Sequence, residues 1–118
     1  MKIGIIGAGK VGCSIGKYLT EYGFSVAGYC SKSKKSVEEA ATFTNTKAYD
    51  SLAELVAEST ILFLTTPDGA LESVWNELKK ESIQNKIVCH FSGSLSSDLF
   101  SNREEYGVSA ASFHPMYA

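Results

Sequence analysis

Three glycines near the N-terminus constrain the fold of this chain more than any other feature. The sequence opens with MKIGIIGAGKVGCSIGKYL, in which Gly7, Gly9 and Gly12 follow an apolar run and precede an amphipathic stretch. A GxGxxG pattern between a strand and a helix is typical of a turn that binds the pyrophosphate of a dinucleotide. Gly7 permits the tight turn, Gly9 lets a phosphate approach the backbone, and Gly12 permits close packing of the helix against the strand. We expect the phosphates to lie at the helix N-terminus.

The simpler alternative is that these glycines only permit a sharp bend of the backbone. We favour the phosphate-binding interpretation because a strand, a helix and a second strand are all expected around the motif. This interpretation also assigns to the cofactor the residues between and beside the glycines: Ala8, Lys10 and Val11.

Apolar runs alternate with helical patterns along the chain. We expect strands at six places: 2–7, 24–30, 46–49, 60–66, 86–91 and 108–114. Helices are expected in most of the intervals, which makes a βαβ series. The runs TILFLTT and KIVCHF lack the alternation of half-exposed strands, as expected of parallel strands covered on both faces. The sequence therefore predicts an α/β fold, a doubly wound and mainly parallel sheet of about six strands with helices on both faces, forming one domain over residues 1–118.

Two helices are predicted from apolar residues at spacings of three and four. In the first helix one stripe is expected to face the sheet: Val11, Ile15, Tyr18, Leu19 and Tyr22. Gly23 follows as its C-terminal stop. A later helix is expected to bury a similar stripe: Leu71, Val74, Trp75 and Leu78. We expect Trp75 and the helical tyrosines to belong to the core rather than to a binding site.

Three helix starts are predicted from capping residues. Ser36 with Glu39, and Ser51 with Glu54, match the Ser-x-x-Glu capping box, so a helix is expected to begin at each. Asp68 is expected to be the N-cap of a further helix.

The composition disfavours several functional classes. The chain has 118 residues, with 11 basic and 13 acidic side chains and a formal net charge of -2, so we expect no nucleic-acid partner. We expect no membrane span and no signal peptide, because apolar runs are short and few residues precede the first glycine. Cys13, Cys30 and Cys89 lie in apolar segments without CxxC spacing, so neither disulfides nor a metal site is expected. A cytoplasmic location is predicted.

The end of the second strand indicates which dinucleotide is preferred. About 20 residues after the glycine-rich turn, an Asp or Glu would hold the ribose 2′-hydroxyl of NAD. The sequence has Ser31, Lys32 and Ser33 there. Hydroxyl and ammonium groups donate to a 2′-phosphate, whereas a carboxylate repels it, so the sequence predicts that NADP(H) is preferred over NAD(H). The alternative is a solvated lysine-rich turn without a cofactor role.

With these motifs the chain resembles the Rossmann domains of the 6-phosphogluconate dehydrogenase-like superfamily, which includes pyrroline-5-carboxylate reductases, prephenate dehydrogenases and deazaflavin-dependent NADP reductases. The resemblance covers essentially the whole chain, and within the superfamily the chain looks most like the Rossmann-like domain of two-domain oxidoreductases. The segments that carry it are GAGKVG, YCSKS, LFLTTPD, HFSGSLSS and HPM. The resemblance implies that Thr65, Thr66, Pro67 and Asp68 border the cofactor and that the HFSG segment, with Ser92 and Gly93, lies beside the nicotinamide.

Two histidines are candidates for chemistry on the substrate, because each ends a predicted strand. Ligands of open α/β sheets bind beyond the carboxyl ends of the strands, where His90 and His114 are expected. The HPM segment resembles one in prephenate dehydrogenases whose histidine acts on the substrate hydroxyl, which makes His114, with Ser92, a catalytic candidate as general acid or base. Phe113 and Tyr117 stand where that family has glycines, and a structural role for both histidines stays open.

The leading hypothesis is the cofactor-binding part of an NADP-dependent oxidoreductase that transfers hydride between nicotinamide and a small organic substrate. The alternative is a nucleotide-sensing regulatory module without catalysis, because ligand-gating domains of potassium transport systems also begin with a strand and GAG(K/R)VG. Those domains typically have an Asp at the end of the second strand, where this chain has Ser31. A degenerate scaffold is a third alternative, which the three intact glycines disfavour.

The end of the sequence, SFHPMYA, is where the resemblance implies a further, helical domain that completes the active site and often forms a dimer. We therefore expect residues 1–118 to lack that domain and to bind cofactor without turning over substrate. A homodimer is a candidate assembly. An apolar cluster of Phe113, Met116 and Tyr117 is expected to favour self-association.

Overall fold

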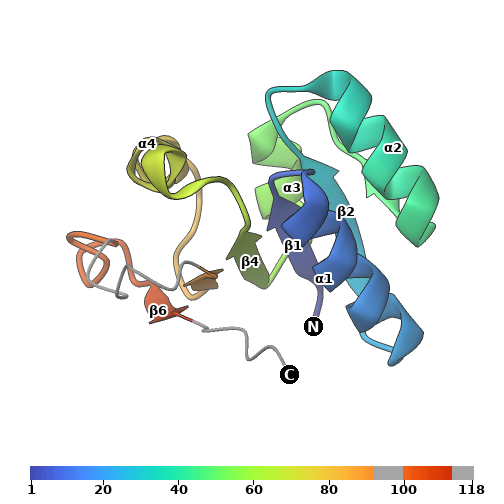
Figure 1. The fold of residues 1–118 in the computed structure, drawn as a ribbon. Coiled ribbons are helices and arrows are strands. Elements are labelled where there is room, and N and C mark those ends of the chain that lie inside the picture. The colour runs from blue at the N-terminus through green and yellow to red at the C-terminus, as the bar shows by residue number, and fades with distance from the viewer. Residues whose placement is uncertain (92–99, 113–118) are drawn as a thin grey trace.

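One parallel sheet organises the chain, with the strand order β3-β2-β1-β4-β5-β6 (Figure 1). The structure is a computed structural model, and it describes residues 1–91 and 100–112. The strands are β1 (Ile3–Ile6), β2 (Val26–Cys30), β3 (Lys47–Ala48), β4 (Ile61–Leu64), β5 (Ile87–His90) and β6 (Ser109–Ser112). The helices are α1 (Lys10–Glu21), α2 (Lys34–Thr44), α3 (Leu52–Glu58) and α4 (Asp68–Leu78). Every strand pairing is parallel, so the predicted α/β fold is confirmed.

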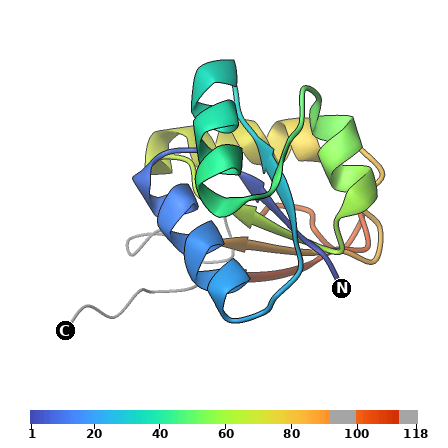
Figure 2. The same cartoon turned by 90° about the vertical axis from the view of Figure 1, so that its right-hand side faces the viewer.

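Helices cover both faces of this sheet, as predicted. Successive residues of β4 point to opposite sides: Leu62 and Leu64 pack in one core with α3 and α4, whereas Ile61 and Phe63 pack in another with α1 and α2. In Figure 1 and Figure 2, α1 and α2 lie side by side, away from α4. Packing on both faces explains why the strand sequences are apolar throughout rather than alternating.

The apolar stripe of α4 is buried, as predicted from its spacing: Leu71, Val74, Trp75 and Leu78. The Trp75 ring is fully buried and meets the Phe100 ring nearly edge-on, with centroids 5.3 Å apart. Its Nε1 donates a hydrogen bond of 2.9 Å to the carbonyl oxygen of Ser101. The indole therefore anchors the segment that precedes β6.

The stripe predicted for α1 is only partly correct: Leu19 packs against the core, but three other members do not. Val11, Tyr18 and Tyr22 are 44%, 59% and 68% exposed, and the two tyrosine rings contact each other on the surface with centroids 4.5 Å apart. The buried residues of this helix are Gly12 and Gly16. Two glycines on the inner face let the helix lie so close to the sheet that larger side chains are turned outward.

Tyr29 of β2 occupies the space that these two glycines leave. Its ring is fully buried, and its hydroxyl donates to the Gly12 carbonyl oxygen at 2.8 Å. A Cβ on Gly16 would overlap the Tyr29 hydroxyl oxygen. Burial raises the pKa of this phenol to about 12, so the hydroxyl stays protonated as a donor at neutral pH.

The C-terminal stop predicted for α1 is confirmed. Gly23 has a positive φ of 83°, and its N–H donates to the Thr20 carbonyl oxygen while the Phe24 N–H donates to that of Leu19. These two bonds form the Schellman motif, in which glycine avoids the steric cost of the left-handed conformation.

One predicted capping box is confirmed and the other is wrong. Ser51 is the N-cap of α3, and its Oγ accepts a hydrogen bond of 3.2 Å from the Glu54 N–H. The helix predicted to begin at Ser36 begins earlier, because Ser33 is the N-cap of α2 and its Oγ accepts from the Ser36 N–H at 3.3 Å. Two serines three residues apart offer two alternative caps, and Ser33 with Ser36 forms the one that the chain uses.

The N-cap predicted for α4 is also wrong. Pro67 occupies this position and Asp68 is the first helical residue. The Pro67 carbonyl oxygen accepts a hydrogen bond of 2.8 Å from the Ala70 N–H. Because proline lacks an N–H, the N-cap residue itself has no backbone donor that needs a partner at this turn.

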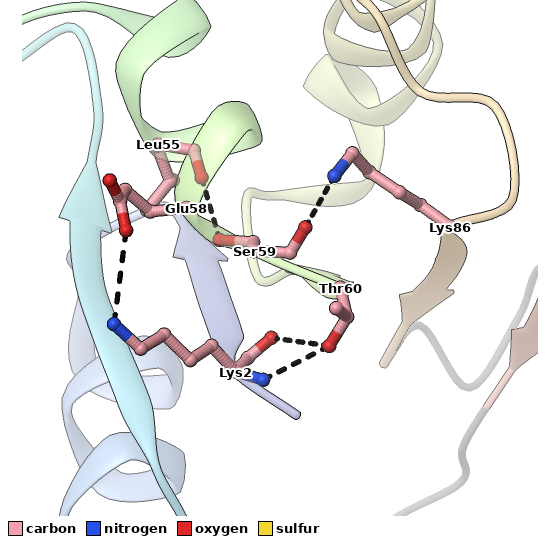
Figure 3. A network of polar contacts seen from close by, with 6 residues as sticks. All are labelled: Lys2, Leu55, Glu58, Ser59, Thr60 and Lys86. Atoms are coloured by element: carbon pink, nitrogen blue, oxygen red, sulfur yellow. Dashed lines mark hydrogen bonds and ion pairs between the residues drawn. The ribbon is translucent and has the colours of Figure 1, made fainter.

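A polar cluster closes the amino edge of the sheet, where β1 and β4 begin (Figure 3). The Lys86 ammonium donates to the carbonyl oxygen of Ser59, the C-cap of α3, at 2.6 Å, and the Ser59 hydroxyl donates to the Leu55 carbonyl oxygen at 2.6 Å. The Lys2 N–H donates to the Thr60 hydroxyl at 3.0 Å, and that hydroxyl donates back to the Lys2 carbonyl oxygen at 3.1 Å. These bonds join the end of α3 and the start of β4 to the residues that precede β1 and β5.

Across residues 1–91 and 100–112, the helices are all too short or too polar to cross a membrane.

Candidate functional site

A groove lies at the carboxyl edge of the sheet, where the strand order reverses between β1 and β4. Its volume is about 430 Å³. Nine of its lining residues were predicted from the sequence as cofactor-binding: Gly7, Ala8, Gly9, Lys10, Val11, Ser31, Thr65, Thr66 and Pro67. In open α/β sheets such a crevice is where ligands bind. The sequence motifs from three separate loops therefore meet in one groove.

The three glycines of the motif play different parts in this groove. Gly7 has a φ of 108°, and a Cβ there would lie 2.7 Å from the Thr65 hydroxyl oxygen. Gly12 does not line the groove; a Cβ on it would overlap the Gly7 carbonyl oxygen, so it keeps α1 against the turn. A Cβ on Gly9 would meet no atom within 4 Å and would enter the groove. Gly7 and Gly12 thus shape the turn, as the motif indicated, while Gly9 leaves space.

The loop after β4 forms the opposite wall. The Thr65 hydroxyl is 3.2 Å from the Ile6 carbonyl oxygen and 3.0 Å from that of Gly7, so it donates to the glycine-rich turn and fixes the two walls together. The Thr66 hydroxyl oxygen is buried and has no hydrogen-bond partner among the described residues. An unpaired buried hydroxyl is costly, so this wall is poised for a polar ligand.

A second cavity of about 320 Å³ adjoins the groove beyond the end of β2. The two share three lining residues: Ser31, Thr66 and Pro67. The walls of the second cavity are mainly apolar, with side chains from β1, β2, α3 and α4: Ile6, Cys30, Leu52, Ala70 and Val74. Polar groups at this cavity come from Lys32, Ser73 and Glu77. A ligand that fills both spaces would pass from a polar cradle to an apolar slot.

The residues predicted to select NADP occupy three different environments. Ser31 lines both cavities, and its hydroxyl accepts from the Ser33 N–H at 3.1 Å. Lys32 is exposed and lines the second cavity. Ser33 lines neither cavity, and its hydroxyl lies 3.0 Å from that of Ser36 while it caps α2.

The thiols are poor nucleophiles. Cys13, Cys30 and Cys89 are all free. Burial raises the pKa of the Cys89 thiol to about 11, and burial followed by the carboxylates of Asp50 and Glu77 raises that of Cys30. Thiols whose pKa is raised in this way are weak nucleophiles at neutral pH. No cluster of three or more metal-ligating side chains occurs among the residues that the structure describes.

His90 ends β5 but turns away from the groove. Its ring is fully buried with its centroid 5.6 Å from that of Phe100, in the core layer on the α4 side, and it lines neither cavity. This environment favours the structural interpretation of His90. The other candidates for the reacting end, Ser92, Gly93 and His114, lie outside the described residues.

The family model of the Rossmann-like domain matches residues 1–115. This chain belongs to the Rossmann-like domain family. The resemblance inferred from the glycine motif and the βαβ series is thereby confirmed. No curated protein matches the sequence.

Solved structures share the fold of this Rossmann-like domain at low sequence identity. A Bacteroides fragilis protein named as an NADP oxidoreductase is 21% identical, with a TM-score of 0.85 over 99% of this chain and 44% of its own. The Myxococcus stipitatus imine reductase in complex with NADP⁺ is 18% identical, with a TM-score of 0.81 over 100% of this chain and 42% of its own. UDP-N-acetylglucosamine 3-dehydrogenase GnnA from Acidithiobacillus ferrooxidans is 19% identical, with a TM-score of 0.76 over 95% of this chain and 37% of its own.

These neighbours share the α/β fold that the motifs predicted. The chain spans less than half the length of each of them.

Several site residues escaped the sequence analysis. Leu64, Phe91 and Ser36 also line the groove. The α4 side of the second cavity consists of residues at helical spacings of three and four, next to the buried stripe: Ala70, Ser73, Val74 and Glu77. This spacing was readable in the sequence as a second helix face, but only the fold shows that the end of β2 lies opposite to it.

Proposed function

We propose that this chain is the cofactor-binding domain of an oxidoreductase that uses NADP(H). The observation that carries the proposal is the open space at Gly9, at the N-terminus of α1, inside a groove at the switch point of the sheet. Backbone N–H groups at a helix start and the positive end of the helix dipole bind phosphate. The unpaired hydroxyl of Thr66 on the opposite wall fits a polar ligand as well.

In this proposal the diphosphate of the dinucleotide lies against Gly9 and Lys10. The adenosine end enters the apolar second cavity, and Ser31 and Lys32 hold a 2′-phosphate at its mouth. The nicotinamide end extends along the groove towards Phe91, which lines it. The bound cofactor supplies hydride transfer, and the chain binds, orients and shields it.

The complete activity is a proposal for a longer assembly. We propose that hydride passes between the nicotinamide and a small organic substrate, with Ser92 and Gly93 beside the nicotinamide and with His114 and Ser92 as the candidate groups that hold or move a proton. A domain spanning less than half of its structural neighbours supplies one wall of such a site. A second wall, from a helical domain or from the partner in a homodimer, is needed to exclude water and to orient a substrate.

Calorimetric titration with NADPH, NADH and ADP tests the cofactor proposal. We expect NADPH to bind at least about tenfold more tightly than NADH, because a charge-assisted contact to phosphate contributes roughly 1.5–3 kcal/mol. Lys32→Asp should abolish this preference. Lys35→Asp is the matched control, because it makes the same charge change at an exposed residue that lines neither cavity.

Equal affinity for the two dinucleotides would contradict the NADP preference. Binding of ADP as tight as that of both dinucleotides would instead favour the nucleotide-sensing alternative, because the nicotinamide half would then contribute nothing.

A further inference from the structure

The second cavity is lined by a carboxylate to which the proposed cofactor-binding function assigns no role. Glu77 lies on the α4 face that lines this cavity, one helical turn beyond Ser73 and Val74. Among the described residues its carboxylate makes neither an ion pair nor a hydrogen bond. An acceptor of this strength at the mouth of an apolar slot is free to meet a donor on a ligand.

Glu77 is also close enough to Cys30, which lines the same cavity, to act on its thiol. Burial, then the charge of Asp50 and then that of Glu77 raise the pKa of Cys30.

The residues that line the second cavity restrict which ligands it can bind. The apolar walls formed by Leu52, Ala70 and Val74 suit a flat heteroaromatic ring. Ser31 lines both the groove and the second cavity, so Ser31 and the adjacent Lys32 mark the end of the second cavity that is nearer the groove. Glu77 lies one turn farther along α4 than Ser73 and its side chain is exposed, so it can meet the edge of such a ring at the mouth of the cavity. A carboxylate accepts hydrogen bonds and repels carbonyl oxygens, and it therefore distinguishes ring edges by their exocyclic group.

We propose that Glu77 is a specificity-determining residue that reads the base of the dinucleotide by accepting a hydrogen bond from the 6-amino group of adenine. The inference rests on the proposed function, because it places the adenosine end in the second cavity. A base with a carbonyl oxygen at the same position, such as hypoxanthine, would set two acceptors against each other. The chain would then select for adenine itself, in addition to any selection for the 2′-phosphate.

The test compares NADPH with its hypoxanthine counterpart, deamino-NADPH, by calorimetry on the wild-type chain and on two variants. In the wild type we expect NADPH to bind about tenfold more tightly, the effect of one hydrogen bond to a charged group. In Glu77→Gln we expect this ratio to fall to about one, since an amide can turn either its oxygen or its nitrogen to the base. Glu72→Gln is the matched control: it makes the same charge change on an exposed face of α4 that does not line the cavity, and its ratio should equal that of the wild type.

Three results would overturn the inference while leaving the proposed function intact: a wild-type ratio near one, a Glu77→Gln ratio equal to that of the wild type, or the same loss in Glu72→Gln. Failure of both dinucleotides to bind the wild type would overturn the proposed function, and the inference with it.

Discussion

Four glycines lie along the turn and the first helix, and each lacks a side chain for a different reason. Gly7 needs its positive φ, Gly12 touches the backbone of the turn, and Gly16 makes room for the Tyr29 hydroxyl. Gly9 has an extended backbone that any residue can adopt, and only open groove surrounds it. Three of these positions therefore serve folding, and the open space at the fourth is where we propose that phosphate binds.

This difference predicts opposite outcomes for two chemically identical substitutions. Gly9→Val should change the free energy of unfolding by only about 1 kcal/mol, the cost of a poorer N-cap residue. It should weaken NADPH binding by about a hundredfold or more, because the side chain fills the phosphate cradle and removes at least two charge-assisted contacts. Chemical denaturation and calorimetric titration measure the two quantities.

Gly12→Val is the control, and it should destabilise the fold by about 2 kcal/mol or more, because its Cβ would overlap the Gly7 carbonyl oxygen. Native-like NADPH affinity in a folded Gly9→Val variant would show that phosphate does not bind at this turn.

The ends of the helices illustrate what a local sequence pattern can decide. The Ser51 capping box matches the structure because no competing hydroxyl precedes it in the same register. At α2 the same pattern is present at Ser36. Ser33, one turn earlier, can also cap the helix, and it is the residue that occupies the N-cap position. Local patterns thus identify a helix start to within a turn, and tertiary packing selects the residue.

The two serines of α2 form a matched pair for a stability test. Ser33→Ala should lower the free energy of unfolding by about 1 kcal/mol, because the Ser36 N–H loses its side-chain acceptor. Ser36→Ala should cost clearly less, since its exposed hydroxyl contributes only the bond to Ser33. Urea denaturation of the two variants gives the comparison. Equal losses, or a larger loss at Ser36, would contradict the cap assignment.

Across the whole molecule, the two edges of the sheet serve different purposes. The groove and the second cavity open at the carboxyl edge, while the polar cluster of Lys2, Ser59, Thr60 and Lys86 ties the amino edge (Figure 3). The length of the strands separates the two edges. Stability and ligand affinity should therefore respond to different substitutions.

Lys86→Met tests this separation. The variant loses the hydrogen bond to the Ser59 carbonyl oxygen at the end of α3, and its thermal midpoint should fall by an amount equivalent to about 1–2 kcal/mol. NADPH affinity should stay at the wild-type value. Lys80→Met is the control, because Lys80 is exposed and its side chain makes none of these contacts. A parallel loss of affinity in Lys86→Met would mean that the two edges are coupled.

The sequence predicted the features that depend on local patterns, such as strands and the glycine-rich turn. It predicted much less about tertiary contacts between residues far apart in the chain. The six strands and the glycine-rich turn follow from periodicity and from backbone needs that are local. The exposure of Tyr18 and Tyr22 does not, because the orientation of α1 is set by Tyr29, which fits against Gly12 and Gly16 from another strand. The second cavity escaped for the same reason, since β2 and α4 are brought together only by the sheet order.

The pairing of β1 with β4 also imposes an order of events during synthesis. Thr65 joins the opposite wall to Gly7, which lies 58 positions earlier in the chain. A nascent chain that has emerged only as far as β3 contains the whole glycine motif but lacks the wall of the groove that the loop after β4 forms. A ligand that contacts both walls needs this contact in place, so we expect it to bind the folded domain rather than a partly synthesised chain. Such a ligand should slow unfolding and thereby stabilise the folded domain.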